Sequence, residues 1–198
     1  VKYAAEFGYR IKLLAVVAKH DADIEVGVHP TLVPMDHMLA SVNGVFNAAM
    51  VRGDMVGDTM FYGRGAGRLP TASTVVGDIG DIARNMAHGE VRYTRAVPTY
   101  GEGITKLRAP GDIVSRFYLR FNVADKAGPF GALTTILGKN GVSISAAAQK
   151  KSTNVDEQGF VPVVVLTHPA AAKAVDAAIA EIRESGVLSE DPVKLRML

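Results

Sequence analysis

The sequence predicts an α+β protein made of two parts joined by a linker. Segments of alternating apolar and polar residues, typical of strands, run through both parts. Three stretches repeat apolar residues every three or four positions, which indicates helices. Residues 90–114, interrupted by proline and glycine, show neither period. We expect residues 1–89 to form a mixed or antiparallel sheet region with a returning helix, and residues 115–198 to form a β-α-β-β-α-β unit.

The first part contains four predicted strands. They cover residues 11–18, 24–30, 45–52 and 55–62. A turn at Asp21–Asp23 separates the first two strands, so we expect these strands to pair as an antiparallel hairpin. Residues 31–40, which include Pro34, are expected to form a loop with a short helical turn near Met38.

A glycine-rich turn joins the fourth predicted strand to a helix. Residues 61–73 read FYGRGAGRLPTAS. Glycine tolerates positive φ and lets the backbone approach a flat or anionic ligand closely, and the N-terminus of the next helix attracts anions. The third glycine of the dinucleotide-binding fingerprint and its βαβ unit are both missing. The turn can therefore supply one wall of a cofactor site, and a plain tight connection is the alternative.

The helix after Pro70 carries an apolar stripe on one face. Its members are Val75, Val76, Ile79, Ile82, Ala83 and Met86. Asp78 and Asp81 lie on the opposite face, where a solvated surface explains them better than a catalytic carboxylate pair. Asn43 and Asn47 flank Gly44; turn and cap chemistry is the first explanation for them, and their role stays open.

The second part shows the clearest alternation. Strands are predicted at residues 117–123, 142–148, 160–167 and 187–198, and helices at 129–140 and 167–185. Thr167 is expected to cap the second helix, and Pro162 favours an edge position or a bulge in the third strand. This order predicts a four-stranded antiparallel sheet with two helices on one face, the ferredoxin-like arrangement.

Composition and charge argue against several classes of function. Basic residues number 22 and acidic residues 20, for a net charge of +2, so nothing favours a nucleic-acid partner. No apolar run is long enough to span a membrane. The absence of cysteine fits a cytoplasmic protein. His29 and His37 are separated by two prolines and do not form a metal-ligand pattern, so we expect no metal.

The second part resembles the ACT domain, a small-molecule sensor attached to enzymes of amino-acid metabolism. The resemblance covers residues 115–198 and rests on a strand followed by DKAGPFGAL and a helix ending in KNGVSIS. It implies an amino-acid effector bound between two copies of the domain, and together with the resemblance of the first part, given next, it implies that this effector is threonine. The implied contacts are Asp125, Gly128, Pro129, Asn140 and Val142. Gly128 would let the backbone approach a carboxylate, and Asn140 offers a donor and an acceptor; a plain helix C-cap is the alternative for Asn140.

The first part resembles the homoserine dehydrogenase family. The segments HPTLVPMDHMLASVNGVFNAAMV and GDTMFYGRGAGRLPTASTVVGDI carry this resemblance, which covers residues 1–87. It implies reversible hydride transfer from NADH or NADPH to aspartate semialdehyde to give homoserine and NAD or NADP, in threonine and methionine biosynthesis. In that family the glycine-rich turn touches the nicotinamide side, which assigns Gly65, Ala66 and Gly67 to cofactor binding.

The chain lacks two parts of that family's pattern. Neither the glycine fingerprint of the nucleotide-binding domain nor the lysine motif that handles the proton is present. We therefore expect the C-terminal portion of a homo-oligomeric, dimeric enzyme, with no catalytic residue of its own and no activity alone. A non-catalytic, amino-acid-binding regulatory protein is the alternative hypothesis.

Overall fold

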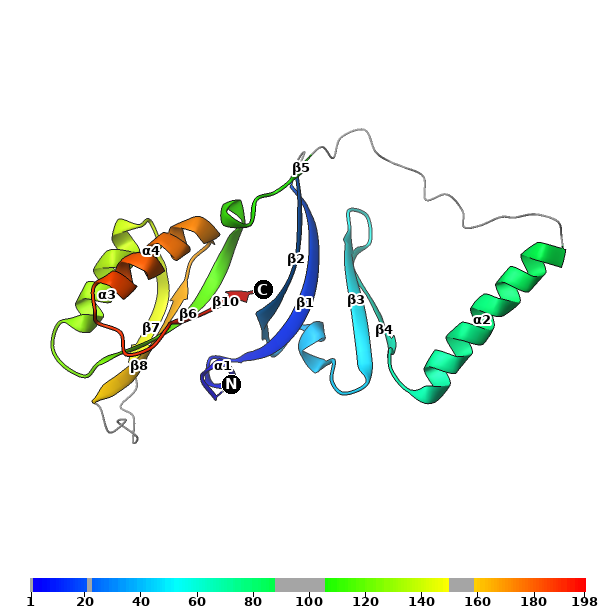
Figure 1. Ribbon diagram of the computed structural model, residues 1–198, viewed down its shortest axis with the longest axis horizontal. Coiled ribbons are helices and arrows are strands. Elements are labelled where there is room, and N and C mark those ends of the chain that lie inside the picture. Colours follow the sequence, from blue (N-terminus) through cyan, green and yellow to red (C-terminus); the bar gives the residue numbers. More distant parts are fainter. Residues whose placement is uncertain (1, 21–22, 88–105, 150–158) are drawn as a thin grey trace. The chain divides into compact units, whose positions relative to one another are not determined.

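The computed structural model describes residues 2–20, 23–87, 106–149 and 159–198 (Figure 1). The chain divides into two compact units, one formed by Val1–Pro34 with Ile104–Leu198 and the other by Met35–Gly103. The first unit is a mixed α+β structure with a mostly antiparallel sheet. The second combines a two-stranded sheet with a long helix. Within the described residues, no helix has the length and apolar character needed to cross a membrane.

The sheet of the first unit joins strands from both ends of the sequence. In spatial order they are β1 (Tyr9–His20), β2 (Asp23–Pro34), β10 (Val193–Met197), β6 (Val114–Ala124), β8 (Phe160–Thr167) and β7 (Ile144–Gln149). Short strands β5 (Lys106–Leu107) and β9 (Ala170–Ala171) pair with β2 and β6. The β2–β10 pairing is parallel, and the other neighbours in the order above are antiparallel.

The predicted hairpin of β1 and β2 is confirmed, but β2 is longer than expected. It continues to Pro34, so the prediction of a loop from residue 31 is wrong for residues 31–34. Thr31 and Leu32 pair with Arg196 and Met197 of β10, and both are buried. A strand partner so far away in the sequence stabilises the extended backbone there, and no local signal announces it.

Two helices cover one face of the sheet, as Figure 1 shows: α3 (Pro129–Lys139) and α4 (Ala172–Glu184). Alternate residues of β6 enter the core beneath them, namely Phe117, Leu119, Phe121 and Val123. The helices contribute the buried residues Leu133, Leu137, Val175, Ala178, Ile179 and Ile182. The helical spacing of apolar residues in this part of the sequence thus corresponds to the buried face of α4. On the opposite face, α1 (Lys2–Glu6) packs over Tyr118, Leu32 and Met197.

Two predictions about the second half of the chain are wrong. The strand β8 lies between β6 and β7, so Pro162 does not mark an edge strand, and the register shift in the β7–β8 pair lies between Ile144 and Ala146. Thr167 does not cap α4, which begins at Ala172. Instead its buried Oγ1 accepts a hydrogen bond from the Phe117 backbone N–H at 2.9 Å.

The second unit follows the predicted element order closely. It contains the 3-10 turn η1 (Met38–Ser41), strands β3 (Phe46–Gly53) and β4 (Gly57–Arg64), and helix α2 (Arg68–Ala87). Arg52 and Asp58 form a two-bonded ion pair across the β3–β4 hairpin, at 2.6 and 3.0 Å. No residue of α2 is buried, although its apolar stripe is present as predicted.

The predicted linker contains more structure than expected. Its described part, from residue 106, forms β5 and the 3-10 turn η2 (Pro110–Asp112) before β6 begins at Val114. Residues 88–105 lie outside the described residues, as does the predicted polar loop at 150–158. The expectation that His88–Gly89 ends α2 likewise falls outside them.

Candidate functional site

The glycine-rich turn lies between β4 and α2, where the sequence placed it. The Gly65 N–H donates to the carbonyl of Val45 at 3.1 Å, which ties the turn to the start of β3. Gly67 has a φ of +128°, a conformation that L-amino acids with side chains avoid. Its carbonyl accepts from the Thr71 N–H at 3.1 Å inside the first turn of α2. Gly65, Ala66 and Gly67 are all exposed, so their backbone is accessible to a ligand.

Asn47 of β3 lies directly against Gly65. A Cβ atom at residue 65 would stand 1.5 Å from Asn47 Nδ2 and 2.6 Å from its Cγ. A side chain at this position is therefore incompatible with the observed position of Asn47. The Asn47 side chain is exposed beside the turn, and the sequence left its role open. A glycine in the turn thus accommodates the amide side chain of the neighbouring strand.

An aromatic pair flanks the same turn on the other face of the β3–β4 hairpin. The rings of Phe46 and Tyr62 stack with centroids 4.9 Å apart and planes 9° from parallel. The guanidinium of Arg64 lies 5.4 Å from the centre of the Phe46 ring. Sequence reasoning did not single out these side chains, because pairing across a hairpin depends on its register. Together they place a cation and a flat surface beside the residues predicted to bind a cofactor.

The residues predicted to bind an effector fall into two groups, one at each end of α3. At the start, Gly128 has a φ of +111° and precedes Pro129, the first residue of the helix. Asp125 accepts a hydrogen bond from Gln149 at 3.4 Å. Asn140 and Val142 follow the other end, and an 11-residue helix places the two groups about 16 Å apart. A single chain does not bring the two groups together.

At the end of α3, Asn140 is held by contacts within the chain. Its Nδ2 donates to the Ile136 carbonyl at 3.0 Å and to Glu181 Oε2 at 2.9 Å. Hydrogen bonds from Lys139 and Asn140 lower the pKa of the Glu181 carboxyl. The predicted helix stop is confirmed, since Gly141 follows with a φ of +75°. The other polar atom of this side chain, Oδ1, has no hydrogen-bond partner among the described residues.

A charged cluster that the sequence did not predict joins β2 to β10. Arg196 Nη1 donates to Glu25 Oε1 at 2.6 Å and to His29 Nε2 at 2.8 Å. His29 Nδ1 lies 3.0 Å from the hydroxyl of Thr31. Burial and the positive charge of Arg196 lower the pKa of His29, so its imidazole accepts from Arg196 in the neutral form. These contacts fix the Arg196 side chain and exist only because β2 and β10 are neighbours.

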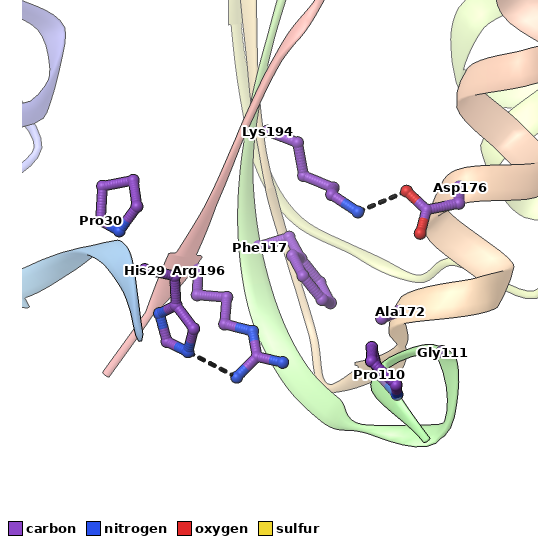
Figure 2. Close-up of a pocket in the computed structure, with 9 residues that line it drawn as sticks. All are labelled: His29, Pro30, Pro110, Gly111, Phe117, Ala172, Asp176, Lys194 and Arg196. Atoms are coloured by element: carbon purple, nitrogen blue, oxygen red, sulfur yellow. Dashed lines mark hydrogen bonds and ion pairs between the residues drawn. The ribbon is translucent and has the colours of Figure 1, made fainter. Parts of the chain in front are cut away.

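A cavity of about 250 Å³ opens beside this cluster (Figure 2). Its lining residues are His29, Pro30, Pro110, Gly111, Phe117, Ala172, Asp176, Lys194 and Arg196. Lys194 forms an ion pair with Asp176, and its ammonium lies 5.7 Å from the centre of the Phe117 ring. All of these residues belong to the first unit. The cavity therefore combines an apolar floor with paired charges.

The two histidines considered as metal ligands make separate contacts. His29 belongs to the cluster just described, whereas His37 Nδ1 accepts the Leu39 N–H at 3.2 Å at the start of η1. In the described residues, no group of three or more His, Asp or Glu side chains is arranged to hold a metal ion.

Comparisons with known proteins point to one family along the whole chain. The homoserine dehydrogenase family model matches residues 1–79. Homoserine dehydrogenases of Neisseria gonorrhoeae and Pseudomonas aeruginosa are 43% and 36% identical to the chain over its whole length. The crystal structure of a homoserine dehydrogenase from Thiobacillus denitrificans matches all of the chain, with 34% identity and a TM-score of 0.83, over 44% of its own length. The chain spans about 45% of the length of the curated relatives.

Proposed function

The chain belongs to the homoserine dehydrogenase family, and the members from Neisseria gonorrhoeae and Pseudomonas aeruginosa match it from end to end; on this premise we propose that it forms the substrate-side and regulatory part of an NAD(P)-dependent homoserine dehydrogenase. In the complete enzyme the nicotinamide cofactor would exchange hydride with aspartate semialdehyde or homoserine. In this proposal the chain carries no catalytic residue, and its residues bind and orient the cofactor and the substrate. This reading is favoured over a stand-alone regulatory protein because the relatives are enzymes.

The observation that carries this proposal is the exposed turn formed by Gly65, Ala66 and Gly67. The backbone of the turn is accessible to a flat ligand, because Gly65, Ala66 and Gly67 are all exposed. The space beside Gly65 is taken by the Asn47 side chain, which lies against the turn. We propose that it forms one wall of the nicotinamide site, and that the remaining walls come from parts of the enzyme absent from this chain.

We propose further that residues 115–198 form an ACT domain with the ferredoxin-like arrangement. The strand order β10-β6-β8-β7, with α3 and α4 on one face, supports this proposal. Residues 1–89 would then be the substrate and dimerisation region and residues 90–114 the linker. The effector of the ACT domain would be threonine, and the protein would act in the cytoplasm. Threonine would bind between two copies of the domain. The separation of Gly128 and Asn140 along α3 supports this position, because a second copy could bring the two ends of the helix together.

A chimera tests the enzymatic part of this proposal. The chain replaces the matching portion of the Neisseria gonorrhoeae homoserine dehydrogenase, and NADH- and NADPH-dependent reduction of aspartate semialdehyde is measured. We expect turnover by the chimera and none by the 198-residue chain alone. A folded chimera without activity would contradict the proposal, and so would turnover by the chain alone. Inhibition of the chimera by threonine, abolished by Asn140→Ala, tests the regulatory part separately.

A further inference from the structure

The cavity between β2, β10, η2 and α4 has the chemistry of a small-molecule site, and it is distinct from the predicted effector residues around α3. Its floor is apolar and is formed by Pro30, Pro110, Phe117 and Ala172. Charged side chains of both signs stand at its rim. No residue of this cavity was singled out for ligand binding by the sequence apart from His29, which was considered only as a metal ligand.

Arg196 presents an unused hydrogen-bonding edge to the cavity. Both of its printed contacts, to Glu25 and His29, are made through Nη1. Within the described part of the chain, Nε and Nη2 have no hydrogen-bond partner. These two nitrogens form the edge of a guanidinium that binds a carboxylate with two parallel hydrogen bonds. Because Glu25 and His29 already fix the side chain, little rotamer freedom would be lost when a carboxylate binds.

Asp176 offers the complementary charge on the other side of the Phe117 ring, as Figure 2 shows. Lys194 bonds its Oδ1, and Oδ2 has no partner among the described residues. Lys194 and Arg196 are two residues apart on β10, which places their backbones about 7 Å apart on the same face. Arg196 and Asp176 line the same cavity, so one small ligand that carries both a carboxylate and an ammonium can contact the two groups.

We propose that this cavity binds an α-amino acid with an apolar side chain. The carboxylate bonds Nε and Nη2 of Arg196, the ammonium bonds Oδ2 of Asp176, and the side chain lies on the floor formed by Pro30, Pro110 and Phe117. Such a ligand contacts β2, β10, η2 and α4 at once. It would therefore tie the β1–β2 hairpin to the helical face of the sheet. The proposal does not depend on the enzymatic activity proposed above.

Calorimetric titration of the 198-residue chain tests this inference with three matched probes. L-valine carries both charges, isovalerate lacks the ammonium, and isobutylamine lacks the carboxylate. We expect L-valine to bind, with backbone amide NMR shifts at Gly111 and Ala172, and the other two probes to bind at least roughly tenfold more weakly. Absence of L-valine binding would overturn the proposal. Equal binding of isovalerate would also overturn it, since the site would then accept any small anion.

Substitutions of the residues that line the cavity test whether the ligand binds there. Arg196→Lys keeps the charge opposite Glu25 but removes the two-bonded edge, and Asp176→Asn removes the acceptor charge; each is expected to weaken L-valine binding roughly tenfold. Lys173→Gln, at an exposed ion pair beside the cavity, is the control and should leave binding unchanged. Unchanged binding in both cavity variants, or shifts confined to Gly128 and Asn140, would overturn the proposal. Should Arg196→Lys fail to fold, Asp176→Asn still decides the outcome.

Discussion

Asn47 and Gly65 lie in contact, with the Asn47 amide nitrogen 1.5 Å from the position that a Cβ on residue 65 would occupy. The observed position of the Asn47 side chain therefore leaves no room for a Cβ atom on residue 65. This contact couples β3 to the residues proposed to form one wall of the cofactor site.

Gly65→Ala is expected to displace the exposed Asn47 side chain and to destabilise the second unit by only about 0.5–1 kcal/mol, because the amide end of Asn47 can rotate away from the new methyl group. Asn47→Ala should relieve most of the overlap, so the double variant should be more stable than the sum of the single variants predicts. Chemical denaturation measures both effects. Gly63→Ala is the control, because nothing lies within 4 Å of its Cβ position. Strict additivity of the Gly65 and Asn47 variants would contradict the contact.

Thr167→Val should destabilise the chain by about 1–3 kcal/mol. Its buried Oγ1 accepts from the Phe117 N–H, and valine leaves that donor without a partner in the core. Thr167→Ser keeps the hydroxyl and should lose clearly less stability. The free energy of unfolding from urea titration distinguishes them. Equal losses in the two variants would show that the methyl group matters and the hydrogen bond does not.

His29 should make stability depend on pH in mildly acidic solution. Burial and Arg196 lower its folded pKa below the usual 6.5. Between the folded and unfolded pKa values the unfolded chain binds more protons, so stability falls as the pH drops below about 6.5. His29→Gln should remove this part of the dependence, while His168→Gln, an exposed histidine, serves as the control. Thermal melts from pH 5 to 8 measure this pH dependence of stability. If the His29→Gln variant showed the same dependence as the unchanged chain, His29 would not be its source.

Truncation of two isoleucines in different helices should change the stability by very different amounts. Ile182 of α4 is fully buried, so Ile182→Ala is expected to cost about 2–5 kcal/mol. Ile79 of α2 is 60% exposed, so Ile79→Ala should change the stability of this chain by less than about 0.5 kcal/mol. Both variants are compared by chemical denaturation. A large loss for Ile79→Ala would show that the apolar stripe of α2 is covered in solution.

Local patterns predicted most elements correctly. The β1–β2 hairpin follows from an apolar strand and an alternating strand on either side of one polar turn, and β8 has the predicted bounds. The end of α3 follows from Asn140 and Gly141, because a left-handed residue after a helix is a local requirement. The position of the glycine-rich turn between a strand and a helix was likewise visible within a few residues.

The predictions that were wrong concern contacts between distant segments. Residues 31–34 were expected to form a loop, yet β10 pairs with them and turns them into strand. Thr167 was expected to cap a helix, yet it bonds Phe117 across the sheet. Each outcome depends on a partner that lies far away in the sequence.

The sequence by itself determined the α+β class, most strands and helices, and the glycine-rich turn, because periodicity and turn chemistry act over a few neighbouring residues. Only the tertiary structure decided the parallel pairing of β2 with β10, the contact of Asn47 with Gly65, and the cluster of Arg196, Glu25 and His29 beside the cavity. These depend on sheet order and register, which are set by the burial of whole faces rather than by any short stretch of chain.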